Sequence, residues 1–264
     1  MPLSLCDKRL FLLDMDGTIY LSETVFDGTL DFLRHVRQSG GRYVFLTNNS
    51  SRSTDAYVQK LARLGIAASP EEFFTSADAA ILYLRKTHQN AVYYVCGTES
   101  LKKQLRAAGL CVADKLQDDI TAVLLGYDTE LTYEKLETCC ILLGRGLDYI
   151  ATHPDMVCPT WYGSAPDCGS VIEMLFTATG RRPKIIGKPQ PEMALAAMEK
   201  FGCAKHETCL IGDRLYTDIA CGVNAGIDTV FVLSGEGVIS DIEKYHVTPS
   251  YIFPNIREVL NSML

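Results

Sequence analysis

Two carboxylates stand one residue apart near the start of the chain, at Asp14 and Asp16 in the stretch LFLLDMDGTIY. They follow a short apolar run, which is typical of a buried strand, so both acids lie where a strand is expected to end. Two carboxylates at this spacing repel each other, and partial burial adds a cost of desolvation. We therefore expect either a cation between the two acids or a proton on one of them.

Further polar groups end three later apolar runs. They are Thr47 and Asn48 after YVFL, Lys188 after KIIG, and Asp213 after CLIG. Ligands of open parallel sheets bind beyond the carboxyl ends of the strands. If these strands are neighbours in one sheet, all of these groups converge on a single site.

Such a set of acids, lysine, hydroxyl and amide suits a phosphate group held together with a divalent cation. Mg²⁺ prefers oxygen ligands and usually keeps several waters, so two or three protein oxygens suffice. The carboxylates of Asp14 and Asp213 and the backbone carbonyl of Asp16 are the candidate ligands. A bound cation would also relieve the repulsion between the two neighbouring acids.

The same residues could carry phosphoryl transfer. Asp14 is the candidate nucleophile, which would attack phosphorus and form an aspartyl-phosphate. Asp16 would protonate the leaving alcohol and afterwards activate a water molecule. Lys188, Thr47 and Asn48 would bind the phosphate oxygens and stabilise the charge that develops on them.

Strands and helices alternate along the chain. The apolar spacing and the turn signals predict a strand at 9–14, a helix at 28–39, a strand from residue 42 and a helix at 53–65,. The same rhythm resumes in three later stretches, at 91–109, 120–146 and 182–236. Repeated strand–helix units predict an α/β fold with a parallel sheet covered by helices.

Composition narrows the function classes. The formal net charge is −7, which disfavours nonspecific binding to nucleic acid or to an anionic membrane surface. Ten cysteines are scattered, several of them in apolar stretches, and this favours free thiols in a reducing compartment. Neither a signal peptide nor a membrane span is evident, so a cytoplasmic protein is expected.

Four segments in chain order carry a resemblance to a known family. They are DMDGTIY, FLTNNSSRS, GKPQPEM and IGDRLYTDIACGVNAG, and they resemble the ordered motifs of the haloacid dehalogenase superfamily, in its NagD and p-nitrophenyl-phosphatase branch. The resemblance implies a Rossmann-like parallel-sheet core with a large inserted α/β cap. It would place the core at residues 1–76 and 183–264, and the cap at residues 77–182.

The resemblance implies a Mg²⁺-dependent phosphatase that acts on small phosphate monoesters, such as nucleotides, sugar phosphates or p-nitrophenyl phosphate. It implies the roles given above for the acids, Lys188, Thr47 and Asn48, with Asp213 as a metal ligand. It adds Asp218 as a supporting acid that orients the metal site or Lys188. A homodimer is compatible with this class of protein, and no residue pattern identifies the physiological substrate.

Other interpretations stay open at this stage. A phosphoryl transferase or mutase of the same fold would use the same nucleophile, and a non-catalytic protein that binds phosphorylated metabolites would keep the fold. His153 stands where asparagine is commoner in relatives. Trp161 and Tyr162 could pack structurally or stack on the leaving group of a substrate.

Overall fold

The computed structural model describes residues 4–160 and 162–264, which form two compact units. The first unit contains the chain up to Thr47, together with Thr54–Phe74 and Lys188–Leu264. The second unit contains Asn48–Ser53 and Thr75–Gly187. The segment Asn48–Ser53 therefore belongs with the second unit. It does so because the Ser50 hydroxyl accepts a hydrogen bond from Tyr127 N, at 3.0 Å, inside the second unit.

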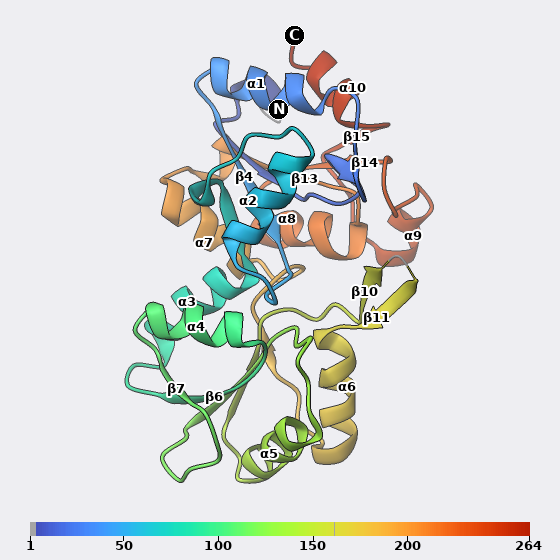
Figure 1. The fold of residues 1–264 in the computed structure, drawn as a ribbon. Helices are drawn as coiled ribbons and strands as arrows, with labels where there is room; N and C mark the ends of the chain where they lie inside the picture. The colour runs from blue at the N-terminus through green and yellow to red at the C-terminus, as the bar shows by residue number, and fades with distance from the viewer. Residues whose placement is uncertain (1–3, 161) are drawn as a thin grey trace. The chain divides into compact units, whose positions relative to one another are not determined.

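A six-stranded sheet forms the centre of the first unit, in the order β15-β14-β13-β1-β4-β5 (Figure 1). Strands β15, β14, β13, β1 and β4 run parallel to one another, which confirms the predicted α/β fold. The strands are β1 (Leu10–Leu13), β4 (Arg42–Thr47), β5 (Phe73–Thr75), β13 (Thr208–Gly212), β14 (Asp228–Val232) and β15 (Tyr251–Phe253).

Helices cover both faces of this sheet because alternate strand residues point to opposite sides. Phe11 and Leu13 share one core cluster with residues of three helices, α1, α2 and α10. Helix α7 packs against β1 and α8 against β14, and buried residues of α7 and α8 form the opposite layer. The helices are α1 (Thr29–Gln38), α2 (Thr54–Arg63), α7 (Glu192–Phe201), α8 (Ala220–Ala225), α9 (Asp241–Tyr245) and α10 (Ile256–Asn261).

A small hairpin follows the first strand. Strands β2 (Tyr20–Leu21) and β3 (Thr24–Val25) pair antiparallel. The turn between β1 and β2 is tight, because Met15 O accepts hydrogen bonds from the backbone of Thr18 and Ile19. Gly17 lies in this turn with φ +89°, a conformation that favours glycine,. Asp16 lies in this turn and forms an isolated β-bridge with Tyr20.

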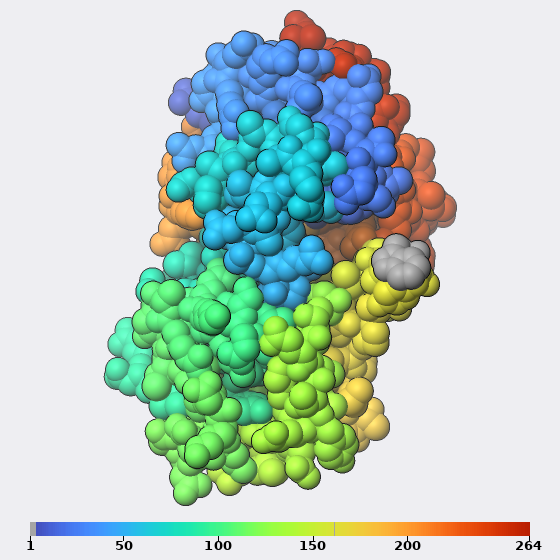
Figure 2. Space-filling model, viewed as in Figure 1, coloured from blue at the N-terminus to red at the C-terminus, as the bar shows by residue number. Residues whose placement is uncertain are grey.

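The first unit is built from both ends of the sequence. Its surface mixes residues from the N-terminal part of the chain, in blue and cyan, with C-terminal residues in orange and red (Figure 2). Helices α1 and α10 pack side by side (Figure 1). Residues more than 150 positions apart in sequence are therefore close in space within this unit, as a discontinuous domain requires.

The second unit has its own parallel five-stranded sheet, in the order β12-β9-β8-β6-β7. Helices α5 and α6 pack against each other (Figure 1) and share a core with alternate residues of the sheet. Strands β10 and β11 form a separate antiparallel hairpin. The elements are α3 (Ser76–Thr87), β6 (Val92–Cys96), α4 (Glu99–Ala107), β7 (Cys111–Ala113), β8 (Ala122–Leu125), α5 (Tyr133–Gly144), β9 (Asp148–Ala151), β10 (Val157–Thr160), β11 (Gly163–Pro166), α6 (Cys168–Thr179) and β12 (Lys184–Ile185).

Two further features bear on the predictions from composition. Each of the ten cysteines, all of which lie in the described stretches, is a free thiol. Among the helices that the structure describes, none is both long enough and apolar enough to cross a bilayer.

Candidate active site

Three neighbouring strands of the first unit end at the same edge of the sheet. Leu13 of β1 lies opposite Phe45 of β4 and Ile211 of β13. The next residue, Asp14, donates its backbone N–H to Ile211 O at 2.9 Å, so Asp14 continues the line of β1. By the same register, Thr47 at the end of β4 and Asp213 after β13 belong to this edge.

Lys188 connects two acids at this edge. Its Nζ lies 2.6 Å from Asp14 Oδ1 and 2.6 Å from Asp218 Oδ1. It also donates to Leu46 O at 3.2 Å, which fixes the ammonium beside the end of β4. The Lys188 side chain is only 4% exposed, so both ion pairs are shielded from water and are stronger than surface pairs.

Burial and like charge raise the pKa values of two acids. Desolvation and the neighbouring Asp218 charge raise the pKa of Asp14 to about 6, although Lys188 opposes the shift. Desolvation, with the charges of Asp14 and Asp218, raises the pKa of Asp213 to about 7. Burial disfavours the charge of Lys188, but Asp14 and Asp218 outweigh it and raise the pKa of Lys188 well above its usual value. Lys188 therefore stays charged and pairs with Asp14 and Asp218.

Backbone and glycine contacts hold Asp213 and Asp218 in place. Asp213 Oδ2 accepts the backbone N–H of Glu236 at 2.8 Å, and Asp218 Oδ2 accepts that of Arg214 at 3.1 Å. A Cβ atom at Gly235 would overlap the Asp213 carboxylate. The loop after β14 can approach this acid closely because residue 235 has no side chain.

These acids can hold a divalent cation. One carboxylate oxygen from each of Asp14, Asp213 and Asp218 lies within 4.8 Å of the other two. Buried carboxylates with raised pKa values are an unbalanced negative cluster, and oxygen donors suit a hard cation such as Mg²⁺. Both carboxylate oxygens of Asp218 are engaged within the protein, Oδ1 by Lys188 Nζ and Oδ2 by the backbone N–H of Arg214, which makes Asp14 and Asp213 the better candidate ligands of the three.

Asp16 is more exposed than these acids. Its side chain is 53% exposed, and its carboxylate lies 3.8 Å from the Nζ of Lys60 on α2. The backbone N–H of Gly17, the next residue, donates to Tyr20 O at 2.7 Å, which ties the turn to the hairpin. Asp16 therefore stands at the base of the hairpin, outside the buried cluster around Lys188.

Asn48 does not belong to the unit that carries these acids. It is part of the second unit, where its Nδ2 donates to Asp155 Oδ1 at 3.0 Å. Its backbone carbonyl accepts the hydroxyl of Ser76 at 2.5 Å. Thr47 and Asn48 are neighbours in sequence, but Thr47 belongs to the first unit and Asn48 to the second. The contact of Asn48 with phosphate stays a prediction.

The second unit contains the unusual histidine. His153 is fully buried, and its Nε2 donates to Asp167 Oδ1 at 3.0 Å, while its Nδ1 contacts Thr152 Oγ1 at 2.9 Å. Asp167 also accepts the backbone N–H of Cys168 at 2.5 Å and so caps α6. Tyr162 is 64% exposed, and Trp161 lies outside the described residues.

Comparisons with known proteins agree with this geometry. Residues 11–111 match the model of a haloacid dehalogenase-like hydrolase family, and residues 185–259 match a HAD-hydrolase-like family. Over 252 residues the chain is 33% identical to an acid sugar phosphatase of Staphylococcus aureus, covering 96% of each sequence.

The chain belongs to the haloacid dehalogenase-like hydrolases. This confirms the predicted family, its NagD and nitrophenyl-phosphatase branch, and the enzyme class, a HAD-like phosphatase.

Solved structures of relatives share the whole fold of this hydrolase. A 4-nitrophenylphosphatase of Thermotoga maritima is 39% identical, with a TM-score of 0.92 over 98% of this chain and 99% of that one. A glycerol phosphate phosphatase of Mycobacterium tuberculosis in complex with calcium is 30% identical, with a TM-score of 0.90 over 97% of this chain and 76% of that one. The same protein is also solved in complex with magnesium.

Sequence reasoning missed two basic residues of this hydrolase. Arg214 is largely buried, and its Nε lies 2.9 Å from Glu236 Oε2. Burial disfavours its charge, but Asp14 and Glu236 outweigh it and raise the pKa of Arg214. Its place directly after Asp213 was an available signal. Lys60 carries no such signal, because it lies within an ordinary amphipathic helix.

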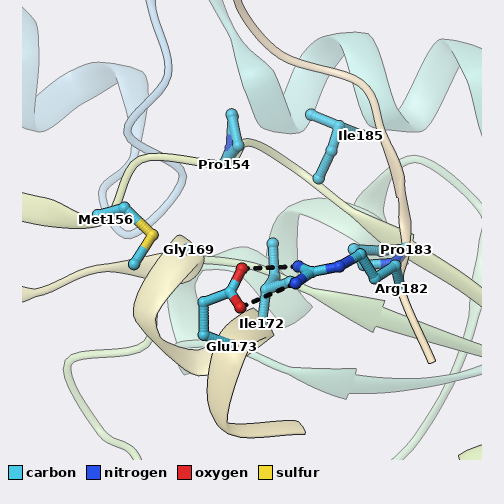
Figure 3. A pocket seen from close by; sticks show the side chains of 8 residues that line it. All are labelled: Pro154, Met156, Gly169, Ile172, Glu173, Arg182, Pro183 and Ile185. Atoms are coloured by element: carbon cyan, nitrogen blue, oxygen red, sulfur yellow. Dashed lines mark hydrogen bonds and ion pairs between the residues drawn. The ribbon is translucent and has the colours of Figure 1, made fainter. Parts of the chain in front are cut away.

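A pocket of about 140 Å³ lies in the second unit (Figure 3). Met156 and Ile172 contribute apolar side chains, and Glu173 and Arg182 form a two-point ion pair beside them, at 2.6 and 2.9 Å. Its lining contains no residue of the acidic cluster and no lysine, and the carboxylate of Glu173 is paired with Arg182. This pocket is therefore separate from the acidic cluster and offers no comparable chemistry.

Proposed function

We propose that this hydrolase is a divalent-metal-dependent phosphatase of small phosphate monoesters that forms an aspartyl-phosphate on Asp14. The observation that carries the proposal is the position of Lys188 Nζ, 2.6 Å from both Asp14 and Asp218, with Asp213 in the same cluster. One oxygen of Asp14 is held by the ammonium, which leaves Oδ2 as the candidate attacking atom. The assignment of the first unit as the catalytic core and of the second as the cap is part of this proposal.

In the first step, Asp14 Oδ2 attacks phosphorus as the bond from phosphorus to the ester oxygen breaks. A proton from the Asp16 carboxyl goes to the leaving oxygen, so an alcohol departs. Lys188 stabilises the negative charge on the phosphoryl oxygens, and Thr47 and Asn48 are proposed as further donors to those oxygens. The product is a mixed anhydride of Asp14 and phosphate.

In the second step, water attacks the same phosphorus. Asp16, now ionised, accepts a proton from that water. The bond from phosphorus to Asp14 Oδ2 breaks, and inorganic phosphate and the free Asp14 carboxylate are released. Asp218 keeps Lys188 oriented in both steps, because its Oδ1 holds the ammonium at 2.6 Å.

The proposed cation is Mg²⁺, held by Asp14, Asp213 and the backbone carbonyl of Asp16. When bound, it would neutralise the acids and allow an anionic phosphate to approach them. One relative, the glycerol phosphate phosphatase, has been solved with magnesium and with calcium, so a divalent cation is supported more firmly than its identity. The proposed substrates follow the names of relatives that act on sugar phosphates, nitrophenyl phosphate and glycerol phosphate.

Purified protein tests the proposal directly. With Mg²⁺, release of inorganic phosphate is expected from p-nitrophenyl phosphate and from members of a panel of sugar, nucleotide and glycerol phosphates, and EDTA should abolish it. Acid-quenched protein should carry phosphate on Asp14 by peptide mass spectrometry. A panel that stays intact, with the metal present, would exclude a phosphatase.

A transferase would give a different balance of products. If added sugars received the phosphoryl group in place of water, release of inorganic phosphate would fall while consumption of the ester continued. Equal amounts of inorganic phosphate and alcohol with every ester support hydrolysis. The homodimer that is compatible with this class of protein is a separate matter that sedimentation or light scattering would test.

A further inference from the structure

Asp16 differs from the other acids in how it is held. Asp14 and Asp218 are fixed by Lys188, and Asp213 is fixed by the backbone of Glu236. The Asp16 carboxyl is half-exposed, yet in the proposed reaction it must deliver a proton to one leaving oxygen. A carboxyl that rotates freely would do this poorly, because proton transfer requires hydrogen-bonding reach and alignment.

Lys60 is the cation beside this carboxyl. Its Nζ lies 3.8 Å from Asp16 Oδ2, and its side chain is 22% exposed. It extends from α2, which is held in the core of the same unit by Tyr57 and Leu61. The ammonium therefore reaches Asp16 from a fixed helix, across the base of the hairpin.

Tyr20 fixes the position of the Lys60 ammonium. Lys60 Nζ donates to Tyr20 Oη at 3.1 Å and lies 4.2 Å from the centre of the Tyr20 ring. Tyr20 is 2% exposed, and burial, with the charges of Asp16 and Asp14, raises the pKa of its hydroxyl. The hydroxyl therefore stays neutral and accepts the hydrogen bond, while the ring attracts the cation.

We propose that Lys60 is a positioning residue that holds the Asp16 carboxyl in place for proton transfer, with Tyr20 as its anchor. This rests on the proposed function, because it gives Asp16 the role of general acid and base. Lys60 does not touch the reacting atoms and acts through Asp16. The ordinary alternative is a lysine that only packs on an aromatic ring and adds stability to the hairpin.

Two esters with different leaving groups separate these roles. An alkoxide such as that from glycerol phosphate needs a proton as it departs, whereas p-nitrophenolate is a stable anion and departs without one. Lys60→Met should lower kcat/KM for glycerol phosphate about tenfold, which is less than the full loss expected when a general acid is removed. The same change should alter kcat/KM for p-nitrophenyl phosphate less than about threefold. The nitrophenyl ester thus also reports that the variant is folded.

Further variants complete the design. Lys60→Arg keeps a cation in reach of the ring and of Asp16, and should restore most of the activity on glycerol phosphate. In an Asp16→Asn background, Lys60→Met should cause no further loss, because the residue through which it acts has already been removed. Lys200→Met is the matched control, since Lys200 also lies over aromatic rings, those of Phe74 and Phe201, in the same unit. Lys200→Met should leave kcat/KM unchanged for both esters.

The outcomes keep the two proposals apart. If wild-type protein cleaves neither ester nor any other member of the panel, the proposed phosphatase itself is wrong. If wild-type protein cleaves both and Lys60→Met lowers both equally or neither, the phosphatase stands and the positioning role of Lys60 is wrong. If Lys60→Met lowers kcat/KM in the Asp16→Asn background by the same factor as in the wild type, the positioning role of Lys60 is also wrong.

Discussion

Each unit of the molecule contains a compact group of three ionisable side chains whose ligand atoms lie within 4.8 Å of one another. In the first unit these are Asp14, Asp213 and Asp218, and in the second they are His153, Asp155 and Asp167. Distance alone would mark both groups as metal sites. Their surroundings separate them, because the balance of charge and of hydrogen bonds differs.

The two carboxylates of the second group accept hydrogen bonds from other groups of the second unit. Asp167 accepts from His153 and from a helix N-terminus, and Asp155 accepts from the amide of Asn48. The first group has two neighbouring cations, Lys188 and Arg214, for three carboxylates, and burial still raises the pKa values of Asp14 and Asp213. Perturbed acids that lack enough partners are typical of functional sites. The comparison teaches that unbalanced charge, more than proximity, distinguishes the candidate active site from a structural network.

The largest expected effect is that of Asp14→Asn. Loss of the proposed nucleophile should lower kcat by about a thousandfold or more with any ester. Because ionised Asp14 is costly in its buried position, the metal-free protein should unfold at an unchanged or higher temperature. Steady-state kinetics and thermal unfolding measure the two effects. Activity within tenfold of wild type would contradict the assignment.

The opposite pattern is expected for Asp167→Ala in the second unit. This change removes the cap of α6 and leaves the buried imidazole of His153 without its acceptor, so the free energy of unfolding should fall by about 2–4 kcal/mol. In the folded fraction, kcat should change less than about threefold. Urea denaturation with parallel kinetics tests this, and Asp167→Asn, which keeps an acceptor, is the control. If Asp167→Ala kept normal stability but lost turnover, the second group and not the first would be the candidate active site.

The contrast also shows what local sequence can reveal. Asp14 and Asp213 were predictable because each follows an apolar strand, and neighbouring parallel strands bring their carboxyl ends together. Asp218 lies in the helical segment Leu215–Ile219 and was predicted only from the family resemblance. The resemblance of four segments to the family motifs then assigned a role to each of these residues. The predicted strand at 9–14 and helix at 28–39 correspond to β1 (Leu10–Leu13) and α1 (Thr29–Gln38).

The remaining contacts were not predictable, because they join elements far apart in sequence without a local signature. Lys60 meets Tyr20 across 40 residues, and its helix pattern is that of any amphipathic helix. Asn48 follows a core strand, yet its side chain bonds to Asp155, 107 residues away. Tertiary packing alone decides such pairs, so the border at Thr47 could not be read from composition.

A metal titration across pH would sharpen the comparison. Folded Asp14 and Asp213 have pKa values of about 6 and about 7, above the ordinary value of 3.8. The folded state therefore binds more protons than the unfolded state between pH 4 and 7, and metal-free stability from these groups falls as pH rises through this window. A divalent cation needs the ionised forms. Mg²⁺ should therefore raise the melting temperature more at pH 8 than at pH 5.

The size of this effect follows from mass action. With Mg²⁺ at a hundred times its dissociation constant, stabilisation is about 2.7 kcal/mol. Asp213→Asn should remove most of the Mg²⁺-dependent shift at pH 8, whereas Asp167→Asn should retain it. A shift that is equal at both pH values, or one that depends on Asp167, would place the metal elsewhere.

The smallest expected effect concerns the glycines that crowd each group. A methyl group at Gly235 would overlap the Asp213 side chain and displace its carboxylate, whereas one at Gly169 would meet the backbone carbonyls of Pro154 and Asp155. Gly235→Ala should therefore stay folded and bind Mg²⁺ about tenfold more weakly, or about 1.4 kcal/mol. Gly169→Ala should unfold more easily with unchanged Mg²⁺ affinity in its folded fraction. Calorimetric titration of both variants decides the matter, because equal Mg²⁺ affinity in Gly235→Ala and wild type would mean that the position of Asp213 does not limit metal binding.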